Sequence, residues 1–231
     1  MKKAILFLLI ATSIVALSFT TSTPEFEGKI SYEITVDAGN MPPEALAMFE
    51  GSQLNIYIKG TKSRSDVSMG FQNTSTISDM KTNTSVTLMD IMGNKYKIKS
   101  DPTKDEKSAD VSVKYLDATK EIAGYKCKRA EITFKDKSGN EQVTGIYYTE
   151  EIANYTGNDS RNSMFKNIKG MPLEYEMRAE RGMKMKMTAK AISKEKVPDS
   201  KFDIPTDYKE TTAEDLQKEM MKMMQQGGGQ H

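Results

Sequence analysis

The 231-residue sequence is poor in the residues on which most hydrolytic enzymes and metal sites depend. It holds a single histidine, His231, and a single cysteine, Cys127. His231 follows three consecutive glycines and Gln230, outside any expected helix or strand. We therefore expect no Ser–His or Cys–His nucleophile pair and no histidine-based zinc site within the fold. Lone Cys127 cannot form a disulfide within the chain. We expect it to be a buried, small apolar residue of a strand.

Acid–base chemistry without histidine would need carboxylates, lysines or tyrosines. These residues are numerous, but they alternate along expected strands or fall in charged loops, as solvated side chains do. The only glycine cluster, residues 227–229, ends a helix instead of opening one, so it does not form a phosphate-binding loop. We therefore expect a protein that is not an enzyme and that carries no cofactor.

The first residues predict export from the cytoplasm. Met1, Lys2 and Lys3 precede an apolar run over residues 4–17, which is short for a membrane span of about 20 residues. The basic start, the short apolar run and small residues near its end predict a cleavable signal peptide over residues 1–18. No cysteine that could be acylated follows the run. The expected location is periplasmic or secreted, with no membrane span in the mature chain.

The mature chain is nearly neutral. Removal of Lys2 and Lys3 from 33 basic residues leaves 31 against 32 acidic residues, a formal charge of −1. Such a chain has no overall electrostatic attraction to nucleic acid or to an anionic membrane, so no nucleic-acid partner is expected. Its length suits a single antiparallel β domain over residues 19–210. A C-terminal amphipathic helix over residues 211–226 and a disordered tail over residues 227–231 would follow.

The strongest local pattern lies in residues 169–191, where apolar and polar residues alternate on both sides of a polar turn. This alternation predicts an antiparallel hairpin with one polar face and one apolar face. The apolar face carries Leu173, Tyr175, Met177, Ala179, Met183, Met185, Met187 and Ala189.

The turn of this hairpin follows from the requirement that residues opposite one another share a face. A three-residue turn over residues 180–182 meets the requirement, because it pairs Met177 with Met185 and Tyr175 with Met187. It also places a glycine where such loops need left-handed backbone.

The remaining patterns predict a mainly β fold built on one curved antiparallel sheet, a half-open β-barrel. A short helix is expected after the first strand, over residues 42–50, because two prolines open it and a glycine ends it. Residues 63–68 are expected to be a polar segment between strands. A single curved sheet must cover its concave face, and the available cover consists of the two helices together with the loops.

Methionine is unusually frequent, with 17 residues. Methionine fills irregular apolar space, so the hairpin face either packs into a core or lines a cavity for an apolar ligand. The candidate lining residues are Tyr175, Met177, Met183, Met185 and Met187. Thioethers also select Cu(I), which makes the C-terminal helix an alternative metal site. Its candidate ligands are Met220, Met221, Met223 and Met224.

Four segments carry a resemblance to a known family: residues 26–30 (FEGKI), 122–130 (IAGYKCKRA), 169–173 (KGMPL) and 202–205 (FDIP). On these segments the chain resembles domain-of-unknown-function family forty-four-twelve, exported bacterial proteins seen mainly in Bacteroidota. The motifs are strand and turn patterns, and the family implies no established catalytic or binding residues. More distantly, the order of elements looks like the half-open β-barrel of periplasmic lipoprotein carriers. In those carriers an antiparallel sheet curls around short helices and shelters acyl chains.

The carrier-like order of elements and the Met/Tyr face lead to one functional hypothesis. We expect an exported, non-catalytic protein that binds an apolar small molecule or a lipid moiety in the concave face of its sheet. The alternatives are a methionine-rich Cu(I)-binding protein and a structural protein that binds a partner in the cell envelope. The sequence leaves open whether the concave face is filled or empty.

Overall fold

One 12-stranded sheet dominates the computed structural model, with the order β12-β6-β5-β4-β3-β2-β1-β11-β10-β9-β8-β7. Neighbouring strands are antiparallel except β12, which pairs parallel with β6. The structure describes residues 25–37, 39, 42–70, 72–99, 111–135, 139–155, 164–178 and 183–227. The predicted signal peptide (1–18), the hairpin turn (180–182) and residues 228–231 of the predicted tail lie outside the described residues.

The twelve strands account for most of the described chain. They are β1 (Gly28–Asp37), β2 (Gln53–Lys59), β3 (Lys62–Met69), β4 (Gln72–Asp79), β5 (Thr84–Ile91), β6 (Asn94–Lys99), β7 (Ser112–Ile122), β8 (Tyr125–Lys135), β9 (Glu141–Thr149), β10 (Met171–Arg178), β11 (Lys184–Lys194) and β12 (Lys209–Glu210). The helical elements are α1 (Pro43–Ala47), the 3-10 helix η3 (Asp199–Phe202) and α2 (Ala213–Gly227).

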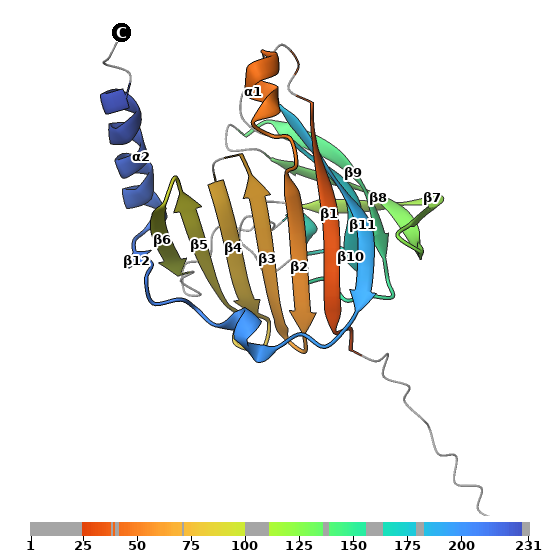
Figure 1. Cartoon of the computed structure of the whole chain (residues 1–231). Helices are drawn as coiled ribbons and strands as arrows, with labels where there is room; N and C mark the ends of the chain where they lie inside the picture. The colour runs from red at the N-terminus through yellow and green to blue at the C-terminus, as the bar shows by residue number, and fades with distance from the viewer. Residues whose placement is uncertain are drawn as a thin grey trace, which may run out of the picture.

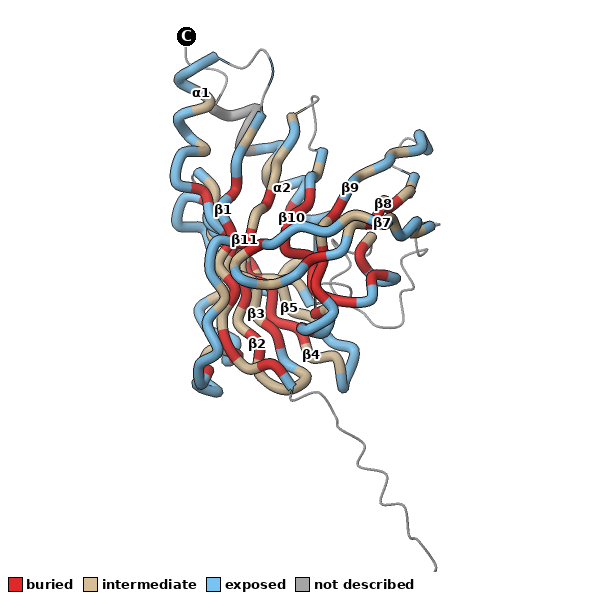
Figure 2. Tube along the Cα trace, turned by 90° about the vertical axis from the view of Figure 1, so that its right-hand side faces the viewer, coloured by how far each residue is buried: buried red, intermediate tan, exposed pale blue. Residues whose placement is uncertain are grey.

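The sheet is strongly curved and does not close into a barrel. Strands β1 to β6 stand side by side in one half, and β7 to β10 turn away behind them (Figures 1 and 2). Pairing registers shift between β1 and β11 at Ser31/Tyr32, between β10 and β9 at Pro172/Glu174 and between β7 and β8 at Leu116/Thr119. Such irregularities increase local twist and bend a strand. The predicted mainly β class with one curved antiparallel sheet is confirmed.

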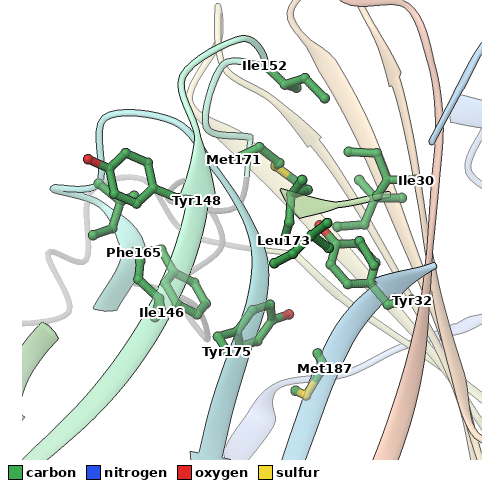
Figure 3. Packing of buried hydrophobic residues seen from close by; sticks show 14 of the residues in the cluster. Ile30, Tyr32, Ile146, Tyr148, Ile152, Phe165, Met171, Leu173, Tyr175 and Met187 are labelled. Carbon is green, nitrogen blue, oxygen red and sulfur yellow. The ribbon is translucent and has the colours of Figure 1, made fainter. Parts of the chain in front are cut away.

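The main hydrophobic core lies on the concave face. Alternate residues of β1 and β2 point there, and Ile30, Ile56 and Ile58 are almost fully buried. The opposite wall comes from β8 to β11, and the segment after β9 adds Phe165 and other buried side chains (Figure 3). The curved sheet thus covers much of its own concave face with its far strands and this segment.

A smaller core lies on the convex face. The segment between β11 and β12 crosses this face with η3 (Figure 1). It buries Val197 and Phe202 against Ile77 and Leu88. An ion pair of 2.7 Å between Lys59 and Asp199 joins β2 to η3.

The two helices do not cover the concave face in the way the sequence suggested. Helix α2 stands at the β6 edge of the sheet (Figure 1), where Leu216 is buried and the Tyr96 hydroxyl lies 3.3 Å from a carboxylate oxygen of Glu219. Its N-terminus is capped by Thr212, whose hydroxyl accepts a hydrogen bond from the Asp215 amide. The segment expected to form the first helix is helical only over the five residues of α1. Neither helix of the described chain is long and apolar enough to cross a membrane.

The prediction that residues 63–68 form a polar segment between strands was wrong. These residues form most of β3, paired with β2 and β4 along its whole length. The strand was missed because its concave positions start with Ser63 and Ser65 instead of large apolar residues. Pairing on both edges supplies the stability that the side chains do not signal.

Candidate functional site

The predicted hairpin is present with the predicted register. Met177 lies opposite Met185, and Tyr175 lies opposite Met187. The Tyr175 ring meets the Phe165 ring edge-on with centroids 4.8 Å apart, and it lies 6.4 Å from the ring of Tyr32 (Figure 3). Tyr175 and Met187 therefore lie in the packed core, with exposures of 4% and 7%.

The other three candidate lining residues lie at the margin of that core. Met177 and Met185 are partly buried and pack against it, and Met183 is half-buried just before β11. None of the five candidates lines either of two clefts that lie next to α1. Their role in ligand binding stays a prediction.

Buried hydroxyl and thiol groups of the core are held in their protonated forms. Burial, with smaller contributions from Tyr175 and Cys127, raises the pKa of Tyr32, whose hydroxyl donates a 2.7 Å hydrogen bond to the Pro172 carbonyl. Burial also raises the pKa of the Cys127 thiol to about 11 and that of Tyr148 to about 12. A raised pKa disfavours the anionic form in which such groups act as nucleophiles, so burial works against a nucleophilic role for them.

Among the residues that the structure describes, Glu174 is the one buried carboxylate. Burial would raise its pKa, but a hydrogen bond from Lys120 and the charges of Lys186 and Lys120 outweigh burial and lower it. Lys120 lies 2.8 Å and Lys186 3.4 Å from the same carboxylate oxygen. This paired carboxylate is ionised at neutral pH and connects three strands, β7, β10 and β11.

The first cleft, which we call the α1 cleft, lies between the turn after α1 and the concave face of β3 and β4. Its volume is about 190 Å³. The turn contributes Met48 and Phe49, which face Val67 and Met69 of β3. Gly70, Gln72 and Thr74 complete its lining.

Local backbone geometry holds the turn of the α1 cleft in place. The Phe49 amide donates to the Leu46 carbonyl, the Ser52 amide donates to the Phe49 carbonyl, and the Ile34 amide of β1 donates to the Ser52 carbonyl. At Gly70, with φ of +57°, a Cβ atom would lie 3.0 Å from the Met48 carbonyl oxygen, so glycine allows this close approach. Sequence reasoning missed this site; the only available signal was the pair Met48-Phe49 next to a helix end.

The second cleft, the β1 cleft, is larger and more open, with a volume of about 650 Å³. It runs along residues 31–36 of β1 and meets Leu46, Phe49 and Glu50 of the α1 region. It exists because β2 begins at Gln53, opposite Glu33, so β1 continues beyond its partner. Glu33 and Lys190 line it and form an ion pair of 2.8 Å. Phe49 lines both clefts.

The candidate copper ligands belong to α2, away from both clefts. Met221 is 48% exposed and Met220 is partly buried. The side chains of Met223 and Met224 lie outside what the structure describes, so the four thioethers cannot be placed as a group. Among the described residues there is no cluster of three or more His, Cys, Asp or Glu side chains that could hold a metal ion.

Comparison with known families identifies the chain. The family described as Domain of unknown function (DUF4412) matches residues 26–208. The chain belongs to this family. The match takes in the hairpin and both clefts of this DUF4412 protein, and it leaves α2 with its methionines outside.

Other comparisons add little to the family assignment. No match was found among curated proteins. Among solved structures, a LolA superfamily protein from Nitrosomonas europaea is 12% identical with a TM-score of 0.37, over 78% of this chain and 91% of that one. The structure of MucB is 11% identical with a TM-score of 0.28, over 79% of this chain and 57% of that one.

Proposed function

We propose that this DUF4412 protein is an exported, non-catalytic binding protein that takes an apolar ligand, or the apolar part of a lipid, into the α1 cleft. The observation that carries the proposal is the lining of that cleft. Met48, Phe49, Val67 and Met69 converge on an unfilled space at the concave face of the sheet. Apolar pockets with a few polar groups are the usual form of small-molecule sites.

The volume of the α1 cleft sets the scale of the interaction. A space of 190 Å³ accommodates roughly six groups the size of a water molecule or a methylene. Each buried methylene contributes about 0.8 kcal/mol, which corresponds to about a fourfold gain in affinity. Longer ligands would extend past Phe49 toward the β1 cleft, whose wider opening reaches solvent.

Export and the lack of catalysis complete the proposal. The signal peptide predicted over residues 1–18 supports a location in the periplasm or outside the cell. The raised pKa values of Tyr32, Cys127 and Tyr148 support a role that involves no activated nucleophile.

Binding of n-alkyl alcohols of increasing length, measured by isothermal titration calorimetry on the mature chain, tests the proposal. We expect affinity to rise about fourfold per methylene and then to level off at about six to eight carbons, when the cleft is full. Alcohols that do not bind at any chain length would contradict the proposal.

A cleft-filling substitution locates the binding. Val67→Phe places a ring into the α1 cleft and should weaken binding of the longest alcohol at least tenfold. The matched control is Val86→Phe, since Val86 is a partly buried valine of the convex core and lines neither cleft. Equal losses in both variants would show a general effect on the fold instead of occupancy of the cleft.

A further inference from the structure

The concave face of strands β3 to β6 is unusual because hydroxyl groups take positions that apolar side chains normally occupy. Pairing places Ser65, Thr76 and Thr87 opposite one another on β3, β4 and β5. The neighbouring row on one side is Ser63, Ser78 and Ser85, and on the other side Val67, Thr74 and Met89. The hydroxyl-lined floor thus begins where the apolar lining of the α1 cleft ends.

One hydroxyl of this floor lacks a partner. Thr76 is 3% exposed, and its Oγ1 atom is buried with no hydrogen-bond partner in the structure. Two other hydroxyls on the same face of β4 have partners: Thr74 accepts a 3.0 Å hydrogen bond from Gln72, and the hydroxyl of Ser78 donates to that of Ser85 at 3.2 Å. A buried polar atom without a partner is costly, so Thr76 calls for a group that the described chain does not supply.

Thr76 lies next to the α1 cleft along strand β4. Thr74, which lines the cleft, is two residues away on the same face of β4, a separation of about 7 Å. Thr76 does not itself line the cleft, so a ligand whose chain lies between Phe49 and Val67 would reach Thr76 only with an end that enters past Thr74.

Charge is absent from this floor. On each of these strands every second residue points to the concave face, starting at Ser63 on β3, Gln72 on β4, Ser85 on β5 and Asn94 on β6. All charged residues of these strands occupy the opposite, convex positions: Lys62, Arg64, Asp66, Asp79, Asp90, Lys95, Lys97 and Lys99. At the β6 edge of the floor, the Tyr96 hydroxyl donates a 3.3 Å hydrogen bond to the carboxylate of Glu219 in α2.

We propose that the α1 cleft and its hydroxyl-lined floor select an uncharged amphiphile, whose neutral hydrogen-bonding end enters first and bonds to Thr76. The inference rests on the proposed apolar-ligand function and adds the class and the orientation of the ligand. An ionised head group would meet no counter-charge on this floor and would lose its hydration, whereas a hydroxyl, ester or amide would satisfy Thr76.

Three ligands of equal chain length test the inference by calorimetry at pH 7.5: 1-octanol, octanoate and octylammonium. We expect octanol to bind at least tenfold more tightly than either ion. Thr76→Val, which removes only the hydroxyl, should weaken octanol about two- to tenfold, and Thr76→Ser should retain its affinity. The control is Thr133→Val, a half-buried threonine on the convex side of β8.

Each outcome decides one of the two proposals. If the three ligands bind equally, or if octanoate binds best, the head-group inference is overturned while apolar binding stands. If Thr76→Val binds octanol as tightly as the original chain, water alone satisfies the hydroxyl and the inference also fails. If no ligand binds, the proposed function itself is wrong.

Discussion

Substitution of Met187 by alanine distinguishes a core role of the hairpin from a ligand-binding role. Met187 lies opposite Ile34 of β1 and opposite Tyr175 of β10, and 93% of its surface is covered by protein. Removal of a buried methionine side chain costs about 2–5 kcal/mol, because both its transfer free energy and the contacts around the new cavity are lost. We expect Met187→Ala to lower the free energy of unfolding by about 3 kcal/mol.

For a domain of this size each kcal/mol corresponds to about 2–4 °C, so the midpoint of thermal unfolding should fall by roughly 6–12 °C. Since the chain has no tryptophan, urea and thermal unfolding are best followed by far-UV circular dichroism. Met92→Ala serves as the control, because Met92 is 80% exposed and should change stability by less than about 0.5 kcal/mol.

Octanol affinity provides the second measurement on the same variants. Met187 does not line the α1 cleft, so Met187→Ala should bind octanol like the original chain wherever it is folded. Unchanged stability together with a loss of octanol binding would contradict a core role for Met187. It would mean that the methionine face of the hairpin is the site, as the sequence first suggested.

Three further predictions concern single residues. Glu174→Gln should be less stable than the original chain at pH 7, and the difference between their urea midpoints should disappear between about pH 5 and pH 3. The reason is that the pKa of Glu174 is lowered, so its stabilisation is present above the unfolded pKa and is lost as pH falls through the folded pKa; a difference that persists in acid would contradict this. Gly170→Ala should lower the free energy of unfolding by about 2 kcal/mol or more, because its Cβ would clash with the Thr149 carbonyl. The control is Gly145→Ala, where the nearest atom is 3.6 Å away in the flexible Arg129 side chain, and an equal loss of stability in both variants by chemical denaturation would disprove the clash. Without ligand, Thr76→Val should raise the free energy of unfolding by about 1 kcal/mol relative to Thr133→Val, and a lower value would show that the hydroxyl has a partner.

Much of the fold follows from side-chain alternation. The register of β10 and β11 follows from parity together with a three-residue turn, because a shift by one residue would place Met177 opposite a lysine. Cys127, expected to be a buried small residue, is fully buried. These features are local, and strand periodicity encodes them directly.

The arrangement of the helices and the position of the clefts depend on long-range contacts. Helix α2 stands at the β6 edge, where β12 pairs with β6, and the sequence around Leu216 carries no signal for that pairing. The clefts depend on where β2 ends relative to β1 and on how the turn at Phe49 folds back. Strand β3 was missed because pairing on both sides outweighs its weak apolar pattern.

Photo-crosslinking shows whether the ligand lies in the α1 cleft. A long-chain alcohol with a diazirine in its alkyl chain would be bound to the mature protein, irradiated, and mapped by peptide mass spectrometry. Binding in the α1 cleft should give adducts at Met48, Phe49, Val67 and Met69, and these should be lost in Val67→Phe but not in Val86→Phe. Adducts confined to Tyr175, Met177, Met183 and Met185 would contradict it.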